Sequence, residues 1–374
     1  MTMREMVERQ DLRGLLPAEI EPIFLSLDEP RYRTKQLFLA LHRHGAVATD
    51  NISHLKKSTR DYLGRHFEIK NLRQINVKIA MDGTRKYQFE THDSHVIESV
   101  FIPHAAKSGR HSLCISSQIG CAMGCTFCAT ASMKLIRSLS ASEIVAQVYL
   151  VAADVLQNGN PDELHLETND RPIHNIVFMG MGEPLHNFAN VVRAIDLLTH
   201  QDGMAFSPRR ITVSTSGLVE KIRDLGEKTG VYLAISLNAT TNDVRNLIMP
   251  VNKKWQIETL LQAARDFPLK VRERITFEYV LLQGVNDSMA DAHRLASLLK
   301  GLKCKVNLIP FNEHPLSPYK RPDAKTVLMF HDILLCAHLS VFTRKTRGDD
   351  IDAACGMLGA KKLEERRKNS GVDL

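Results

Sequence analysis

From about residue 110 onward, the sequence alternates short apolar segments with longer segments of helical period. The short segments predict strands at His111–Ser116, Asn175–Gly180, Arg210–Thr215, Val231–Asn238, Ile275–Leu282, Cys304–Pro310 and, as a further candidate, Ser340–Thr343. The longer segments predict helices at Ala141–Leu156, Asn187–His200, Leu218–Glu227, Ile257–Phe267, Met289–Lys300 and Ala324–Ala337. Strand–helix units of this kind predict an α/β fold with a parallel sheet, either open or closed into a partial barrel. Functional side chains of such sheets gather at the C-terminal ends of the strands.

The other segments suggest a division into four parts. Residues 1–75 follow a helical period and are rich in Lys and Arg, so we expect a small helical accessory domain. Residues 76–105 predict a β-strand linker segment, and the alternating part spans residues 106–345. Residues 346–374 form a polar tail that we expect to end in a charged helix.

The strands of the linker segment are predicted from a turn signal. Asp82-Gly83 is a typical hairpin sequence, and it separates Ile75–Ala80 from Arg85–Glu90. Val96–Ile102 follows as a third apolar strand.

Composition sets loose limits on partners and location. The chain has 49 Lys and Arg against 42 Asp and Glu, for a formal charge of +7, which agrees with a polyanion-binding protein without requiring one. The N-terminus lacks the apolar centre of a signal peptide, and the most apolar stretch, Ile144–Leu156, is too short to cross a membrane. We therefore expect a cytoplasmic protein that has no membrane partner.

The cysteines carry the clearest chemical signal. Cys121, Cys125 and Cys128 place three thiols within eight residues, just after the predicted strand His111–Ser116. Thiolates bind both iron–sulfur clusters and zinc. A structural zinc site needs a fourth ligand, and no second Cys or His pair at short spacing supplies one. A cluster held by three thiolates would leave one iron open to a small ligand.

The spacing CxxxCxxC, with Phe127 before the last cysteine, resembles the signature of the radical S-adenosylmethionine (SAM) superfamily. Further segments resemble the bacterial RNA adenine-C2 methyltransferase family, RlmN: Glu29–Arg33, Asp82–Lys86, Ser112–Cys121, Phe178–Leu185, Ser214–Gly217, Phe277–Leu281, Val306–Asn312 and Asp350–Gly356. The resemblance implies a partial (β/α)6 radical SAM barrel with a small helical N-terminal accessory domain. It also implies a 4Fe-4S cluster on Cys121, Cys125 and Cys128, and SAM as the second cofactor.

The resemblance assigns roles to three further residues. In the family, one SAM molecule methylates a cysteine that maps to Cys355, and a second SAM supplies the radical that activates this methyl group. The carbon then adds to adenine C2, a carbon that ordinary methyl transfer does not reach. Glu98 maps to the base that removes the C2 proton. Cys114 maps to the thiol that forms a disulfide with Cys355 and so releases the product.

By the same resemblance, residues at the ends of the predicted strands correspond to the residues that bind SAM in the family. They are Gly182, Glu183, Ser214, Ser236, Leu237, Asn238 and Asn312. Two positions depart from the family, which usually has His in place of Asn238 and Gly in place of Ala131. Pro184 follows the C2 branch rather than a related branch that methylates adenine C8.

Cys114 and Glu98 also have a purely structural interpretation. Cys114 alternates with apolar residues, as a buried inert thiol would. Glu98 fits an exposed residue on an edge strand. Cys355 differs, because it lies in an acidic, Gly-flanked tail and not in an apolar pattern, which favours an exposed and reactive thiol. Cys304 and Cys336 both fall on apolar faces and are predicted to lie in the core.

The function implied by the resemblance is methylation of adenosine C2 in 23S ribosomal RNA and in transfer RNA. The N-terminal domain would bind RNA, an electron donor such as flavodoxin would reduce the cluster, and the enzyme would act as a monomer. Two alternatives stay open: an adenine-C8 methyltransferase of the antibiotic-resistance branch, and a zinc-stabilised RNA-binding protein without catalysis.

Overall fold

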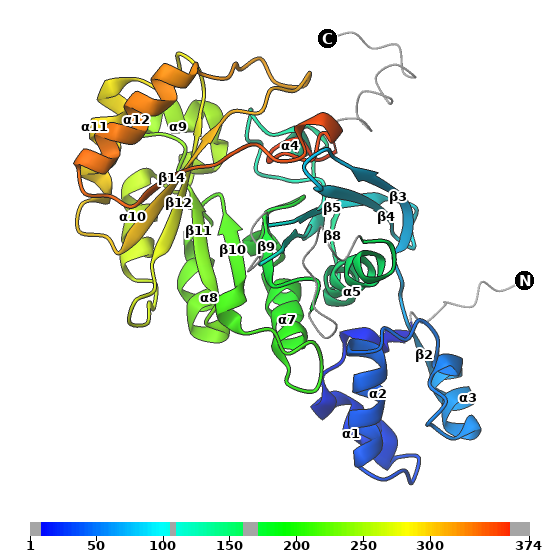
Figure 1. Ribbon diagram of the computed structural model, residues 1–374. Helices are drawn as coiled ribbons and strands as arrows, with labels where there is room; N and C mark the ends of the chain where they lie inside the picture. Colours follow the sequence, from blue (N-terminus) through cyan, green and yellow to red (C-terminus); the bar gives the residue numbers. More distant parts are fainter. Residues whose placement is uncertain (1–8, 105–109, 160–170, 360–374) are drawn as a thin grey trace, which may run out of the picture.

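The computed structural model describes residues 9–104, 110–159 and 171–359. Its centre is a ten-stranded sheet in the order β14-β13-β12-β11-β10-β9-β6-β5-β4-β3 (Figure 1). Seven neighbouring strands of this sheet pair in parallel, as predicted. They are β6 (Ser112–Cys114), β9 (Asn175–Phe178), β10 (Ile211–Thr215), β11 (Tyr232–Ser236), β12 (Ile275–Leu281), β13 (Cys304–Pro310) and β14 (Val341–Thr343).

Helices connect these strands. They are α5 (Ala141–Asn158), α7 (Phe188–Thr199), α8 (Ile222–Thr229), α9 (Asn242–Ile248), α10 (Ile257–Arg265), α11 (Met289–Leu299) and α12 (Ala324–Cys336). Several of them pack on one another: α5 on α7, α7 on α8, α8 on α10, and α11 on α12. Local sequence fixes where several of them begin. Ser140 and Glu143 form a capping box at the start of α5, and Ser288 and Asp291 form another at the start of α11. The short helix α9 was not predicted, because its seven residues offer too little periodicity.

The linker strands continue the central sheet. Here β3 (Arg73–Ile79), β4 (Arg85–Glu90) and β5 (Val96–Ile102) form an antiparallel meander whose last strand pairs with β6. The predicted hairpin at Asp82-Gly83 is confirmed, since the Ala80 amide donates to the Thr84 carbonyl at 2.8 Å and Gly83 has φ 78°. The strands are therefore part of the sheet that carries the rest of the fold.

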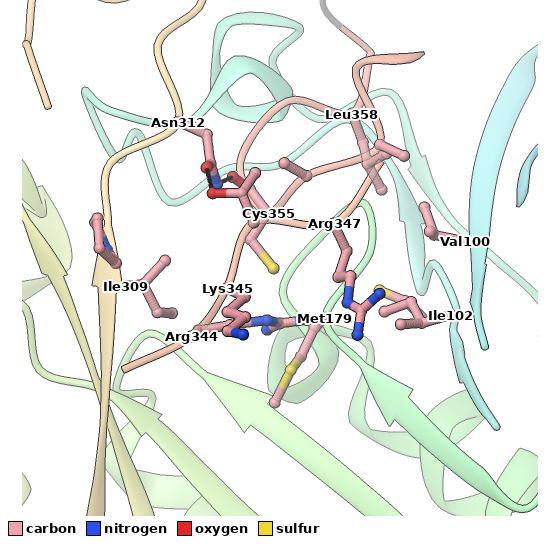
Figure 2. A pocket seen from close by; sticks show the side chains of 15 residues that line it. Val100, Ile102, Met179, Ile309, Asn312, Arg344, Lys345, Arg347, Cys355 and Leu358 are labelled. Carbon is pink, nitrogen blue, oxygen red and sulfur yellow. Dashed lines mark hydrogen bonds between the residues drawn. The ribbon is translucent and has the colours of Figure 1, made fainter. Parts of the chain in front are cut away.

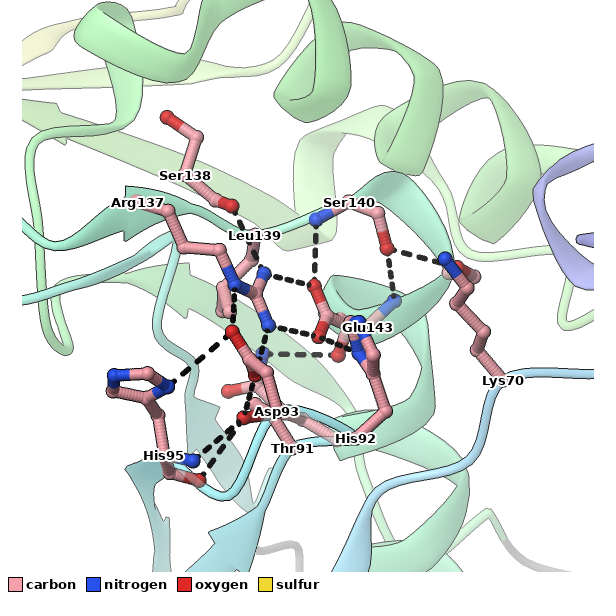
Figure 3. Close-up of polar contacts among 12 residues, drawn as sticks. Lys70, Thr91, His92, Asp93, His95, Arg137, Ser138, Leu139, Ser140 and Glu143 are labelled. Atoms are coloured by element: carbon pink, nitrogen blue, oxygen red, sulfur yellow. Dashed lines mark hydrogen bonds and ion pairs between the residues drawn. The ribbon is translucent and has the colours of Figure 1, made fainter. Parts of the chain in front are cut away.

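Arg137 links the turn between β4 and β5 to helix α5. Its guanidinium bonds both carboxylate oxygens of Asp93, at 2.7 and 2.8 Å, and both of Glu143, at 2.8 Å (Figure 3). The hydrogen bond from Arg137 holds the pKa of Asp93 well below its usual range. His92 completes a group whose ligand atoms lie close enough together for a metal ion. Because Arg137 already binds both carboxylates, we treat this group as a structural ion-pair network.

The N-terminal residues form three helices, α1 (Pro17–Leu25), α2 (Tyr32–His42) and α3 (Lys57–His66). A buried carboxylate joins them, because Glu29 accepts a 2.7 Å hydrogen bond from Thr59 and pairs with Lys56 at 3.3 Å. Fully buried His42 contacts the hydroxyl of Tyr149 on α5 at 2.5 Å, which docks the helices on the sheet domain. Figure 1 shows them at the opposite end of the molecule from the orange-red segment that holds Cys355.

No helix among the described residues is long and apolar enough to cross a membrane. The predicted charged helix at the C-terminus falls within residues 360–374, outside the part of the chain that the structure describes.

Candidate active site

The three clustered cysteines lie in a loop between β7 (Gln118–Ile119) and the short helix α4 (Ala129–Ser132). Gly120 allows this loop to fold tightly, because a Cβ at that position would lie 1.7 Å from the carbonyl oxygen of Lys134. The Thr126 amide donates to the Ile248 carbonyl at 3.0 Å, which anchors the loop on the C-terminal end of α9. Phe127 packs in a small apolar cluster beside the cysteines.

Cys121, Cys125 and Cys128 all line one cavity of about 170 Å³. Burial raises the pKa of the Cys125 thiol well above its usual value, and charge on Cys128 and Cys121 adds to the increase. Burial likewise raises the pKa of Cys121 to about 12. Three convergent thiols that are costly to ionise together suit a shared cation, which would stabilise them as thiolates. The set therefore fits an iron–sulfur cluster with three protein ligands.

The same cavity is lined by the C-terminal ends of the parallel strands, as the fold predicts. Six of the seven predicted SAM-binding residues line it: Gly182, Glu183, Ser214, Ser236, Asn238 and Asn312. The seventh, Leu237, lies in the hydrophobic core with no exposed surface and is not part of the lining. Its amide donates to Glu278 and its carbonyl accepts from Arg245, so both backbone groups are used within the protein.

The loop after β9 needs glycine for a steric reason. Gly182 has φ 97°, and a Cβ there would lie 2.4 Å from the Cβ of Gln118. The neighbouring Glu183 is buried, and its carboxylate accepts 2.7 and 2.8 Å hydrogen bonds from the amide and hydroxyl of Ser216. Burial raises the pKa of Glu183. Glu183 thus links the ends of β9 and β10 at the floor of the cavity.

Sequence reasoning missed a buried carboxylate in this cavity. Glu278 on β12 accepts a 2.9 Å hydrogen bond from Ser214 and a 3.5 Å hydrogen bond from Ser236. Glu278 lies within the Phe277–Leu281 segment, but an acidic residue within a strand has no ligand spacing that would indicate a site. Its position bridges two residues that were predicted to bind SAM.

Asn238, one of the two departures from the family pattern, has a structural role in this fold. It adopts φ 56°, a left-handed conformation that Asn tolerates better than most residues. Its side-chain oxygen accepts a 2.8 Å hydrogen bond from the Val280 amide, and its side-chain nitrogen lies 3.2 Å from the sulfur of Met249. Asn238 therefore lines the cavity with its side chain already engaged by the protein.

Cys114 and Cys355 meet at a second, smaller cavity of about 30 Å³. Cys355 lines both cavities, so the two adjoin. Figure 2 shows the Cys355 sulfur directed into the small cavity, with Arg344 and Met179 approaching from the other side. Burial raises the pKa of Cys114 to about 12, with a further contribution from Cys355. Arg344 lines the same small cavity as both thiols, and charge on Cys355, Glu278 and Cys114 raises its pKa.

The segment that carries Cys355 is fixed to the cluster loop and to a strand end. The Ala129 amide donates to the Gly356 carbonyl at 2.8 Å, and the Asn312 side chain donates to the Cys355 carbonyl at 3.2 Å. The Thr130 hydroxyl donates to the Leu358 carbonyl at 2.8 Å. Cys355 is thereby held between the three cysteines and the end of β13.

Glu98 is buried, so its interpretation as an exposed edge residue is wrong. It lies on β5, an interior strand between β4 and β6. Its carboxylate accepts hydrogen bonds from the Gln88 side chain at 2.8 Å and from the Gly359 amide at 2.9 Å. One further prediction fails: Cys304 is buried as expected, but Cys336, at the end of α12, is exposed.

Comparison with known proteins identifies the family. Residues 115–296 match the radical SAM superfamily. The chain is 46% identical over 351 residues to the dual-specificity RNA methyltransferase RlmN of Geobacter sulfurreducens, covering 94% of this chain and 92% of the relative. It is 47% identical over 332 residues to RlmN 2 of Myxococcus xanthus, covering 89% and 85%. The chain belongs to the RlmN family.

A solved structure supports the fold of this RlmN family member. The crystal structure of a radical SAM methyltransferase from Sphaerobacter thermophilus superposes with a TM-score of 0.86 at 40% identity, covering 94% of this chain and 99% of that one. The predicted partial radical SAM barrel is thereby confirmed. Glu98, Cys114 and Cys355 lie outside the residues that match the superfamily.

Proposed function

We propose that this protein is a radical SAM methyltransferase that transfers a methyl group to C2 of adenosine in 23S ribosomal RNA and in transfer RNA. The observation that carries the proposal is the shared cavity of Cys114 and Cys355, which adjoins the cavity of the three clustered cysteines. A carrier thiol beside a cluster site and a resolving thiol within its reach are the two parts that this chemistry requires. The names of the RlmN relatives support RNA as the substrate.

The cofactor assignments follow the lining of the larger cavity. Cys121, Cys125 and Cys128 would hold a 4Fe-4S cluster, leaving one iron for SAM. When bound, the cluster and two SAM molecules per turnover supply a methyl group and one-electron chemistry. The SAM-binding residues would be those that line the cavity, namely Gly182, Glu183, Ser214, Ser236, Asn238 and Asn312. Leu237, whose backbone groups are already used, would position its neighbours.

The protein's own groups would then act in sequence. Cys355 carries the methyl carbon on its sulfur. Once the one-electron chemistry of the bound cofactors has taken a hydrogen atom from this carbon, the carbon bonds to adenine C2. The bond from C2 to its own hydrogen then breaks, with the proton passing to Glu98 and the remaining electron returning to the site's one-electron chemistry. The Cys114 sulfur bonds to the Cys355 sulfur while the bond between Cys355 sulfur and carbon breaks. The bonding pair stays with the carbon, which takes up a proton to complete the methyl group.

The remaining assignments concern partners and domains. We propose that residues 1–75 form an RNA-binding accessory domain, that residues 106–345 form the barrel, and that residues 346–374 form the carrier tail. Several N-terminal cations are already paired, as Lys35 is with Asp202 at 2.7 Å, but exposed pairs of this kind are weak and can exchange for phosphate. We further propose that an electron donor such as flavodoxin reduces the cluster and that the enzyme acts as a monomer.

Mass spectrometry of RNA from a strain that lacks the gene tests this function. We expect 2-methyladenosine to disappear from both 23S ribosomal RNA and transfer RNA, and to return when the wild-type gene is restored. Loss of 8-methyladenosine instead would assign the enzyme to the C8 branch. Unchanged methylation of both RNAs, together with zinc rather than iron in the purified protein, would favour the RNA-binding protein without catalysis.

A further inference from the structure

The hairpin between β3 and β4 holds the segment that precedes Cys355. The Met81 amide donates a 3.0 Å hydrogen bond to the Asp350 carboxylate, and the Lys86 ammonium donates a 2.9 Å hydrogen bond to the Asp352 carbonyl. These contacts join parts of the chain that are 269 and 266 residues apart. The Asp82–Lys86 segment therefore contacts the residues that precede the carrier thiol, Asp350 and Asp352.

The sheet register places Lys86 on the face that carries the reaction. Lys86 on β4 lies opposite Val100 on β5, and Val100 lies opposite Cys114 on β6. Two residues further along β4, and therefore on the same face, Gln88 lies opposite Glu98. Directly opposed residues point to the same side of a sheet, so all five share one face.

Lys86 contacts both the proposed base and the carrier segment. Its side chain is 3% exposed, and its ammonium lies 3.7 Å from Oε1 of Glu98 as well as 2.9 Å from the Asp352 carbonyl. A buried ammonium is costly unless it is paired and hydrogen-bonded. The two contacts compensate the burial of the ammonium, and through it they link Glu98 to the carrier segment.

The two oxygens of Glu98 are held differently. Oε1 accepts a 2.8 Å hydrogen bond from the Gln88 side chain and forms an ion pair with the Lys86 ammonium at 3.7 Å. Both partners lie on the neighbouring strand β4. Oε2 receives only the Gly359 amide at 2.9 Å among the hydrogen bonds of the described residues. The Gly359 amide comes from the carrier segment and not from β4, so its withdrawal would free Oε2 while the contacts of Oε1 to β4 remain.

We propose that Lys86 is a positioning residue for proton removal: it holds Oε1 of Glu98 and the Asp352 carbonyl together, so that Oε2 faces the adenine carbon bonded to Cys355. This role rests on the proposed function of Glu98 and Cys355. Lys86 itself touches no reacting atom. Its loss should affect the step that Glu98 performs and spare the methylation of Cys355, which precedes that step.

The test compares Lys86→Met, Lys86→Gln and Lys86→Arg in the full holoenzyme, with Lys78→Met as a matched control. Lys78 is the register partner of Lys86 on β3, so its variant removes one positive charge from the same sheet. Three quantities are measured: methyl on Cys355 by peptide mass spectrometry, methylated RNA, and RNA covalently attached to the protein on a denaturing gel. Glu98→Gln is run in parallel.

For Lys86→Met and Lys86→Gln we expect normal methyl on Cys355, about tenfold to hundredfold less methylated RNA, and accumulation of the RNA-linked protein. Lys86→Arg should recover most of the product, and Lys78→Met should match the wild type. A double variant with Glu98→Gln should make no less product than Glu98→Gln alone, because both changes act on one step.

Other results overturn the proposal. If both neutral variants lose Cys355 methylation together with product, Lys86 serves the fold and not proton removal. Normal product from either neutral variant also excludes the role. If Glu98→Gln itself accumulates no RNA-linked protein and makes normal product, the proposed function of Glu98 has failed, which is a separate result from failure at Lys86.

Discussion

The Gly359 amide donates a 2.9 Å hydrogen bond to Oε2 of Glu98, across 261 residues of sequence and within a buried environment. The proposed base is therefore covered by the segment that carries Cys355. In the proposed reaction, Oε2 can accept the C2 proton only after this contact opens, so exposing the base requires the Gly359 amide to move away.

The role of Glu98 is tested by Glu98→Gln. Glutamine keeps the size of the side chain and can still accept the Gly359 amide, but it cannot take up the C2 proton. We expect the variant to keep its cluster and to methylate Cys355 normally, while its methylation of RNA becomes about 10²- to 10⁴-fold slower. Glu90→Gln, on the adjacent strand β4, is the matched control. A normal rate of RNA methylation in Glu98→Gln would show that Glu98 is not the base.

The cluster site is tested by Cys125→Ala. Two remaining thiolates cannot hold a cluster with one open iron, so we expect the purified variant to lose most of its iron and labile sulfide and all cleavage of SAM. Cys336→Ala removes an exposed thiol far from the cavity lining and should keep the wild-type iron content. Full iron occupancy with turnover in Cys125→Ala would remove the basis for the cluster assignment.

The SAM cavity is tested by Gly182→Ala. The added methyl group would lie 2.4 Å from Gln118 Cβ, so the loop after β9 must move. Gly284→Ala is a close control, because Gly284 also has positive φ, 69°, but has open space around its Cα. We expect Gly284→Ala to lose about 1 kcal/mol of stability from backbone strain, and Gly182→Ala to lose more because the clash with Gln118 adds to that strain. Only Gly182→Ala should also weaken SAM binding, measured by calorimetry. Equal SAM affinity in the two variants would contradict the placement of this loop.

The docking of the N-terminal helices predicts a pH dependence of stability. Burial lowers the pKa of His42 from 6.5 to about 3, with Arg13 adding to the effect. Below pH 6.5 the unfolded histidine therefore takes up a proton that the folded one does not, so the free energy of unfolding falls as the pH falls. Between pH 7.5 and 5.5 the wild type should lose about 1.4 kcal/mol relative to His42→Gln, measured by denaturant unfolding. Parallel pH profiles of the two proteins would show that His42 titrates freely.

Much of the fold could be predicted because its signals are local. The apolar strands, the helices between them and the Asp82-Gly83 hairpin each depend on a short stretch of sequence, and β4, β5 and β13 were predicted with their observed bounds. The burial of Glu98 could not be predicted in this way. It depends on β5 having a partner on each side, and one of these pairings, with β6, joins the linker segment to the barrel.

The candidate site likewise contains residues that local sequence identifies and residues that only the tertiary fold brings together. The spacing of Cys121, Cys125 and Cys128 indicated a metal site because all three ligands lie in one loop. The convergence of Cys114 and Cys355 required either the fold or a family resemblance. Lys86 belongs to a segment that resembles the family but had no role assigned to it, and Arg344 gave no signal in the sequence, because basic residues are usually solvated and only tertiary packing buries them.

The proposed cysteine pair gives the most direct test of the mechanism. Cys114→Ala removes the resolving thiol and leaves the carrier, so Cys355 should add to adenine and stay bonded to RNA. Cys304→Ala is the matched control, since Cys304 is equally buried but outside both cavities. Cys355→Ala has no carrier and should form no adduct.

The measurement is the mobility of denatured Cys114→Ala protein from cells, with and without ribonuclease. We predict a slow band that ribonuclease removes, absent from Cys304→Ala and Cys355→Ala. A single protein band from Cys114→Ala, together with normal RNA methylation, would contradict the thiol-carrier mechanism even if the cluster is present.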